Sequence, residues 1–218
     1  MYKRQVVTSG EYEFANTLDL GAVYAMDLKR YFVTRGFYPN DTIDARLELM
    51  DLWSDFDGGV IDQVNAKMLF RATNDDPTGA PTWTSWQEFV NGTFNGRGFQ
   101  FKTEMTSSNP SQNILVDQLG YEATFQRRTD QSVASITSSA GATAVTFPHP
   151  FFTGTSVLGG VNAYLPSVGI TAQNIQSGDY FQIGSVTSTG FTIIFYDSSN
   201  VAVSRDFTWT ATGYGKGV

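Results

Sequence analysis

Hydrophobic and polar residues alternate one by one in several stretches of this chain. From Phe99 to Met105, the odd positions carry apolar residues or threonine, while the even positions carry Gln, Lys and Glu. The same alternation occurs in residues 45–49, 119–125 and 207–211. Because successive side chains of a strand point to opposite faces of a sheet, this pattern predicts strands with one buried and one solvated face.

Turn-forming residues separate these stretches, and helical periodicity is almost absent. We expect strands at residues 11–15, 28–35, 44–50, 64–72, 99–106 and 117–126, and then at 133–137, 143–147, 157–163, 180–187, 191–196, 201–204 and 206–212. Asp197-Ser198-Ser199-Asn200 and Thr189-Gly190 are expected to form hairpin turns. Short strands at this spacing are typical of antiparallel sandwiches. The sequence therefore predicts an all-β fold with two antiparallel β-sandwich domains in tandem.

Charge divides the chain into two unequal parts. Of the 21 acidic and 14 basic residues, those after residue 130 are Asp179, Asp197, Arg205, Asp206 and Lys216 alone. The remainder of this second part is rich in serine, threonine and glycine. We place the boundary between about residues 126 and 133, with an N-terminal domain at 1–129 and a C-terminal domain at 130–218.

The overall composition excludes several classes of protein. The net charge of -7 and the pI near 4.6 argue against a nucleic-acid surface, which needs clustered lysine and arginine. No stretch approaches the ~18 consecutive apolar residues that span a bilayer, so we expect no membrane insertion. The absence of cysteine excludes disulfides and thiolate metal sites. The N-terminus lacks the apolar core of a signal peptide, which predicts synthesis in a cytoplasm.

Candidate catalytic chemistry is sparse. His149, the single histidine, lies between two prolines and has no evident partners for a serine–histidine–carboxylate triad. The acidic cluster at residues 74–76 and the cluster of Asp51, Asp55 and Asp57 lack the ligand spacing of a calcium loop. We therefore predict no catalytic residue, no metal site and no cofactor, and the chain is not expected to be an enzyme.

Tryptophans are the usual stacking platforms for sugars, so Trp83 and Trp86 suggest a sugar-binding pair. On an extended strand, residues three apart point to opposite faces, so one of the two indoles is expected in the core. Trp209 alternates with Phe207 and Ala211 and is also expected in the core.

Polar or aromatic side chains flanked by turn residues are the best candidates for receptor contacts. They are His149, Tyr164, Asn174, Asp179 and Tyr180 in the second domain, and Asp75 and Asp76 in the first. The sequence gives no ligand for any of them.

Two groups of segments carry a resemblance to a known family. The first group consists of residues 71–77, which contain Asp75-Asp76-Pro77, residues 81–89 around Trp83 and Trp86, and residues 96–101. The second group consists of residues 145–147, 176–180, 188–191 and 203–215. In this order they resemble the C-terminal part of tail-tip attachment proteins of tailed bacteriophages, also called host-specificity or central tail fibre proteins. The resemblance covers roughly residues 18–215. Family members are commonly far longer, so it implies either a fragment or a compact relative.

Roughly the last 80 residues separately resemble H-type lectin domains, which are β-sandwiches. The matching segments are Val145-Thr146-Phe147, Ser188-Thr189-Gly190-Phe191 and Trp209-Thr210-Ala211. These residues are structural, and the family's sugar-contacting positions have no counterpart that can be assigned here. Carbohydrate binding therefore follows from the resemblance alone.

Together the resemblances imply a virion structural protein of the tail tip or fibre. Its expected partners are other phage tail proteins and a host cell-surface glycan or outer-membrane receptor. Its expected state is a homotrimer, and its expected location is the virion tail after synthesis in the host cytoplasm. Two alternatives remain open: a free carbohydrate-binding lectin module, and a glycan-degrading tail enzyme with a carboxylate pair.

Overall fold

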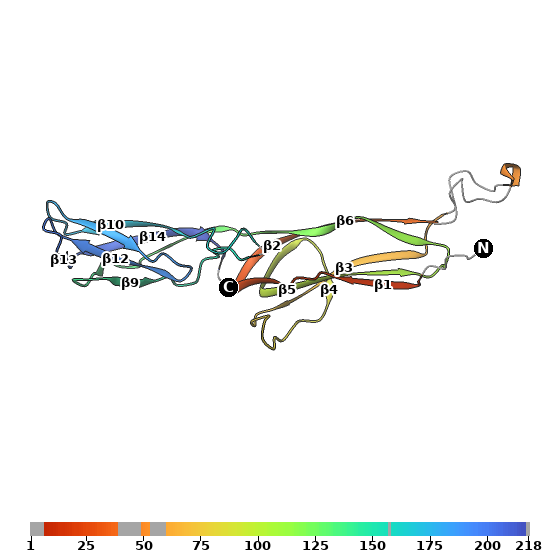
Figure 1. The fold of residues 1–218 in the computed structure, drawn as a ribbon, viewed down its shortest axis with the longest axis horizontal. Helices are drawn as coiled ribbons and strands as arrows, with labels where there is room; N and C mark the ends of the chain where they lie inside the picture. Colours follow the sequence, from red (N-terminus) through yellow and green to blue (C-terminus); the bar gives the residue numbers. More distant parts are fainter. Residues whose placement is uncertain (1–6, 39–48, 53–59, 157, 217–218) are drawn as a thin grey trace.

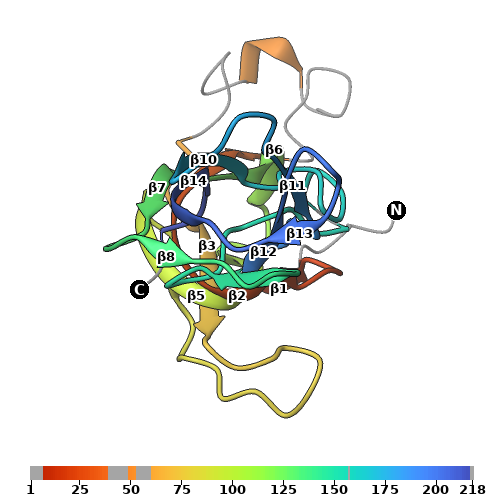
Figure 2. The same ribbon diagram turned by 90° about the vertical axis from the view of Figure 1, so that its left-hand side faces the viewer.

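The computed structural model describes residues 7–38, 49–52, 60–156 and 158–216. These residues form an elongated rod in which two β-structured parts lie end to end (Figure 1). The view along the rod shows strands arranged around a central axis, with one long loop projecting to the side (Figure 2). The described residues contain one helical turn, a 3₁₀ turn at Met50–Leu52, and no helix long and apolar enough to cross a membrane.

Strands account for most of the described residues, and every pair of named strands is antiparallel. In the first part they are β1 (Ser9–Glu13), β2 (Leu18–Phe37), β3 (Val64–Thr73), β4 (Gln87–Glu88), β5 (Gly92–Ser107) and β6 (Asn113–Thr124). In the second part they are β7 (Arg127–Gln131), β8 (Ile136–Thr137), β9 (Thr143–Thr146), β10 (Ser167–Gln173), β11 (Tyr180–Gly184), β12 (Gly190–Tyr196), β13 (Ala202–Val203) and β14 (Asp206–Tyr214). The expected all-β fold is confirmed.

The first part is built from one six-stranded sheet that folds over its own core. β3 pairs along one edge of β5, while β1 and the first half of β2 share the other edge. The second half of β2 pairs with β6 instead. Since β2 thus belongs to both layers, β6 lies across the core from β5, and the rings of Phe101 and Tyr121 stack with centroids 4.1 Å apart.

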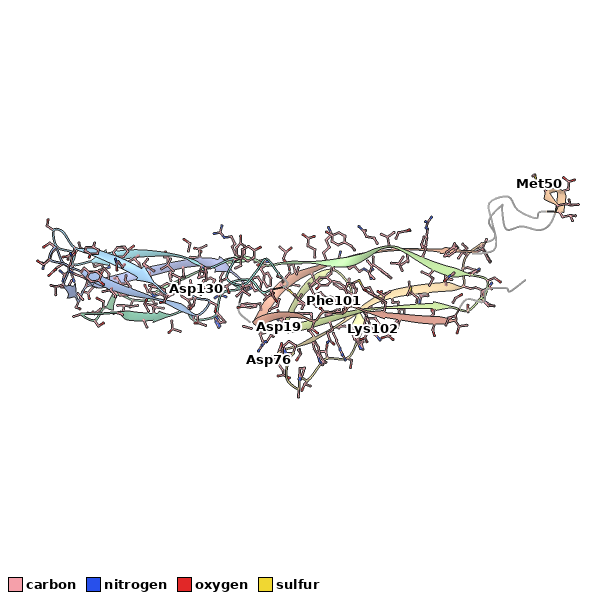
Figure 3. The ribbon with its side chains drawn as sticks, viewed as in Figure 1. Asp19, Met50, Asp76, Phe101, Lys102 and Asp130 are labelled. Carbon is pink, nitrogen blue, oxygen red and sulfur yellow. The ribbon has the colours of Figure 1, made fainter. Side chains whose placement is uncertain are left out.

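The core of the first part confirms the alternation seen in the sequence. Phe99, Phe101 and Thr103 of β5 are all buried, and they pack with Met68 and Phe70 of β3. Figure 3 shows Phe101 inside this part of the rod. Full burial of a side chain of this size stabilises the folded state by about 1.5–3 kcal/mol. The inward set of residues 99–105 therefore holds the two layers together.

The second part is a sandwich of two four-stranded sheets. One sheet has the order β10-β14-β7 with β8 beside β14, and the other has the order β11-β12-β13 with β9 beside β12. The inward residues of β12 and β14 meet between the sheets. They are Phe191, Ile193 and Phe195 from β12, and Phe207, Trp209 and Ala211 from β14. The predicted core position of Trp209 is confirmed.

The two parts join through a closely packed junction. β6 leads into β7 through Phe125 and Gln126 alone, so the expected boundary after residue 129 falls inside β7, which pairs with β14. Phe152 extends from the second part into the core of the first and stacks on Phe125 with centroids 4.0 Å apart. The chain also returns to the first part, where the amide of Ala25 donates to the carbonyl of Lys216 at 3.0 Å.

Arg128 closes the junction from the side of the second part. Its guanidinium donates to the carbonyls of Gly215, His149 and Pro150, and it forms an ion pair with Asp130 at 3.2 Å. Because these carbonyls come from separate segments, one side chain fixes the positions of β7, of the loop after β9 and of the chain beyond β14.

Several predicted strand positions need correction. The strand expected at 28–35 is the second half of the 20-residue β2, and that at 99–106 is the second half of β5. The strand expected at 157–163 is wrong: residues 158–163 form turns, in which Asn162, Gly159 and Gly160 have positive φ, and the strand is β10 instead. The two predicted hairpin turns, before β12 and between β12 and β13, are confirmed.

Some predictions lie outside the described residues. These are the strand at 44–50 apart from its last two positions, the alternation at 45–49 apart from Leu49, and the acidic residues Asp55 and Asp57. Asp51 is described and lies exposed in the 3₁₀ turn.

Candidate functional site

The seven candidate residues lie in three separate places. Asn174, Asp179 and Tyr180 lie at the end of the rod far from the junction, which we call the distal end. His149 and Tyr164 lie in the long segment between β9 and β10, next to the junction. Asp75 and Asp76 lie in the loop that projects sideways between β3 and β4 (Figure 2).

Asn174 and Asp179 at the distal end serve the fold. The side chain of Asp179 is only 2% exposed; it accepts a hydrogen bond from Arg205 Nε at 2.6 Å and another from the amide of Gln176 at 2.8 Å. These bonds hold the pKa of Asp179 below its usual range, with the Arg205 bond as the largest cause. Asn174 has a φ of 56° and donates to Asp206. Both side chains thus fix turns.

Tyr180 remains exposed to solvent at the same end. It is 40% exposed, and its ring stacks on Tyr196 of β12 with centroids 5.1 Å apart. Its hydroxyl donates to Asn200 Oδ1 at 3.0 Å. The two rings stand on the outward face of the sheet, because the next residue of β11, Phe181, points inward and pairs with the buried Phe195.

A hollow adjoins this tyrosine pair on the outward face. Its volume is about 470 Å³, and its lining residues are Gln182, Ile183, Gly184, Thr192 and Ile194. Gln182 faces Ile194 across the strand pair and Gly184 faces Thr192. None of the residues that line this hollow is among the seven sequence candidates. The sequence signal that could have indicated it is the second set of alternating residues in β12, Thr192, Ile194 and Tyr196, which carries no charge on the outward face.

His149 and Tyr164 are not brought together into one site. His149 is exposed, and its carbonyl, not its imidazole, takes part in the junction by accepting from Arg128. Tyr164 is 42% exposed and packs near Phe152 and Tyr214, with ring centroids 6.5 and 5.8 Å away.

A second hollow lies beside Tyr164 at the junction. Its volume is about 290 Å³, and aromatic rings from both parts line it, together with Leu158 and Gly159. These rings are Phe125, Phe152, Tyr164 and Tyr214. Nearby, burial raises the pKa of the Tyr24 hydroxyl to about 12. The hollow is mostly apolar, and its walls are the same rings that hold the two parts together.

Asp75 and Asp76 organise the projecting loop. Asp75 accepts from the amide of Thr82, and Asp76 accepts from both the hydroxyl and the amide of Thr78. Asp76 also forms an ion pair with Arg97 at 2.9 Å, and Arg97 contacts Asp19 on β2 at 3.1 Å. Figure 3 shows Asp19 and Asp76 on the side of the rod from which the loop projects. The bonds from Thr78, and then Arg97, lower the pKa of Asp76.

The expectation that one indole of Trp83 and Trp86 lies in the core is wrong. Residues 81–86 are not a regular strand, so the two side chains need not alternate. Both indoles are half-buried against the same guanidinium, that of Arg71, whose Cζ lies 5.1 Å from the ring of Trp83 and 4.6 Å from that of Trp86. Lys102 Nζ lies 4.9 Å from the ring of Trp86. The tryptophans therefore fasten the loop to the outward face of β3 and β5.

Across residues 7–38, 49–52, 60–156 and 158–216, no group of three or more His, Asp or Glu side chains is arranged to hold a metal ion. The exposed tyrosine pair and the adjoining hollow lie on the outward face of β11 and β12, where a ligand can reach them.

No family model, no curated protein and no solved structure matches this chain.

Proposed function

We propose that this chain is a receptor-binding virion protein of a phage tail tip or fibre, and that its distal end contacts a glycan or outer-membrane receptor on the host surface. The observation that carries this proposal is the exposed tyrosine pair at the far end of the rod, together with the hollow that lies on the same outward sheet face between this pair and the junction. The sequence resemblance to tail-tip attachment proteins supports the same assignment.

The junction supports this proposal, because a receptor-binding end must be held in a fixed direction. Phe152 in the core of the first part and Arg128 on three carbonyls join the two parts through several segments. The first part, which carries most of the charged residues, would then face other tail proteins, and the second part, which carries few, would face the host. A homotrimer would present three distal ends, which raises the avidity of individually weak contacts.

Binding to bacterial surfaces tests the proposal directly. The full chain, fluorescently labelled, is applied to intact cells of a panel of bacterial strains and to their purified surface polysaccharides. We expect saturable binding to some strains and not to others. Absence of binding across a broad panel, with the chain shown to be folded by circular dichroism, would contradict the proposal.

The solution mass separates the virion protein from a free lectin module. Light scattering at several concentrations should give a stable trimer for a tail-tip or fibre protein. A monomer that binds glycans would favour the free module instead.

A further inference from the structure

We propose that the outward face of the β9–β12–β11 sheet binds an uncharged saccharide, with the hollow beside Gly184 holding a sugar ring. The inference rests on the proposed function, because it names the ligand class that the distal part would recognise. It goes further by assigning the site to one sheet face and to specific side chains.

This sheet face carries no charge among its outward positions. The register places ten residues there: Ala144 and Thr146 of β9, Tyr180, Gln182 and Gly184 of β11, Gly190, Thr192, Ile194 and Tyr196 of β12, and Ala202 of β13. Solvated faces of strands usually carry charged side chains, so a face of hydroxyl, amide, aromatic and aliphatic groups is unusual. An acidic sugar would find no cation here, in a chain with a net charge of -7.

The shape of the face leaves room for a small ligand. Gly184 lacks a side chain at the position opposite Thr192, and the hollow there measures about 470 Å³. This volume lies within the about 300–1,000 Å³ typical of small-molecule sites. Tyr180 and Tyr196 lie four positions along the strands from Gly184 and Thr192, beyond Gln182 and Ile194, and form an aromatic edge on the same face.

The lining chemistry matches a sugar that has no charge. The amide of Gln182 can donate and accept hydrogen bonds at once, as can the hydroxyl of Thr192, and vicinal hydroxyls of a sugar need both. Ile194 in the hollow, and the tyrosine rings that lie beyond it on the same face, offer apolar surface to the C–H face of a pyranose. Polar groups that fix orientation beside an apolar wall are the general design of a ligand site.

Filling the hollow is the sharpest test. Gly184 has ordinary strand φ, and a Cβ there would lie 3.2 Å from Thr192 Oγ1, so Gly184→Val occupies the hollow with a side chain that strands favour. Gly169→Val is the matched control: Gly169 is an outward glycine in β10, the edge strand of the opposite sheet. It also faces a threonine, and its Cβ would lie 3.0 Å from Thr210 Oγ1.

Binding is measured on an array that pairs neutral oligosaccharides with uronic, sialylated and phosphorylated ones. We expect the wild-type chain to bind neutral members, and we expect Gly184→Val and Gln182→Ala each to weaken that binding by about tenfold or more, equivalent to about 1.4 kcal/mol. Gly169→Val should bind as the wild type does. Gln182→Ala keeps the test valid if Gly184→Val fails to fold, since it only shortens an exposed side chain.

Three outcomes overturn the inference. They are saccharide binding unchanged in both Gly184→Val and Gln182→Ala, binding restricted to acidic sugars, and binding to bacterial cells with none to any saccharide. In all three the chain still recognises a surface, so the proposed function survives. A change of solution mass in Gly184→Val but not in Gly169→Val would assign the face to contact between copies of the chain, and would also overturn the inference.

Discussion

The two parts of the rod bury the same kind of residue but expose different ones. In the first part, the outward face of β3 and β5 carries Arg71, Gln100, Lys102 and Glu104, and the loop with Trp86 covers it. In the second part, the outward face of β11 and β12 is uncharged and uncovered. The inward alternation therefore determines that a sheet forms, while the outward residues determine what the sheet can contact.

The largest expected effect comes from separating the two parts. Phe152→Ala should lower the free energy of unfolding by about 3–5 kcal/mol, because it removes a ring buried in the core of the other part. Differential scanning calorimetry should then show two transitions. Phe147→Ala, which empties only the second core, should destabilise the second part without loosening the junction. A single transition in Phe152→Ala would show that the parts stay coupled without this ring.

A pair of glycines compares packing in the two parts. A Cβ on Gly213 of β14 would lie 2.6 Å from Phe151 Cδ1, so Gly213→Ala should cost about 1–3 kcal/mol. A Cβ on Gly120 of β6 would meet nothing within 4 Å, so Gly120→Ala should stabilise by about 0.4–1 kcal/mol. Urea unfolding of each variant gives both values. If Gly213→Ala changed the free energy of unfolding as Gly120→Ala does, the ring of Phe151 would have to move aside for the added Cβ.

The covered face of the first part can be tested at its tryptophans. Trp86 lies against both Arg71 and Lys102, whereas Trp83 lies against Arg71 alone. Loss of these cation–π contacts should cost about 1–2 kcal/mol in Trp86→Ala, and less in Trp83→Ala. Proteolysis of the projecting loop should accelerate in the same order. The reverse order would contradict the assigned role of Trp86.

The smallest expected effect concerns how the free energy of unfolding decreases at acidic pH. The pKa of both Asp179 and Asp76 is lowered in the folded state, so each stabilises the fold above the unfolded value of about 3.9 and loses that contribution as the pH falls through the folded value. Asp179→Asn and Asp76→Asn should therefore flatten the acid side of the stability curve. The flattening should be larger for Asp179, whose side chain is 2% exposed against 50% for Asp76. Urea unfolding between pH 2 and 6 measures it, and equal slopes would contradict the difference in burial.

Local patterns made much of the fold predictable. The alternation around Phe101 and Trp209 is a property of neighbouring residues, and both segments form strands with the expected inward set. The first half of β2 keeps the same alternation at Leu18, Leu20, Tyr24 and Met26. It escaped prediction because Gly21-Ala22-Val23 interrupts it at the register shift. β10 was also missed, although Val168, Ile170 and Ala172 alternate along it with polar residues and a glycine.

The candidate site depended on contacts that no local pattern encodes. The neighbouring turn residues correctly indicated that Asp179 and Asp76 lie in turns. They could not indicate that Arg205 and Arg97, from distant segments, form ion pairs with these two carboxylates. The prediction for Trp83 and Trp86 failed because residues 81–86 do not form a strand, and because both indoles pack against Arg71 of β3, which no local pattern indicates. Tyr180 and Tyr196 meet only through the β11–β12 register.

The direction of the strands has a mechanical consequence. The strands run along the long axis of the rod (Figure 1), and hydrogen bonds between antiparallel strands lie perpendicular to them. Tension applied between the two ends therefore loads each ladder in shear, so that many bonds must break together and not one after another. The return of the chain from β14 to Ala25 adds a second load path across the junction, parallel to the covalent link between β6 and β7. Such a rod can transmit a pulling force along its length without unzipping.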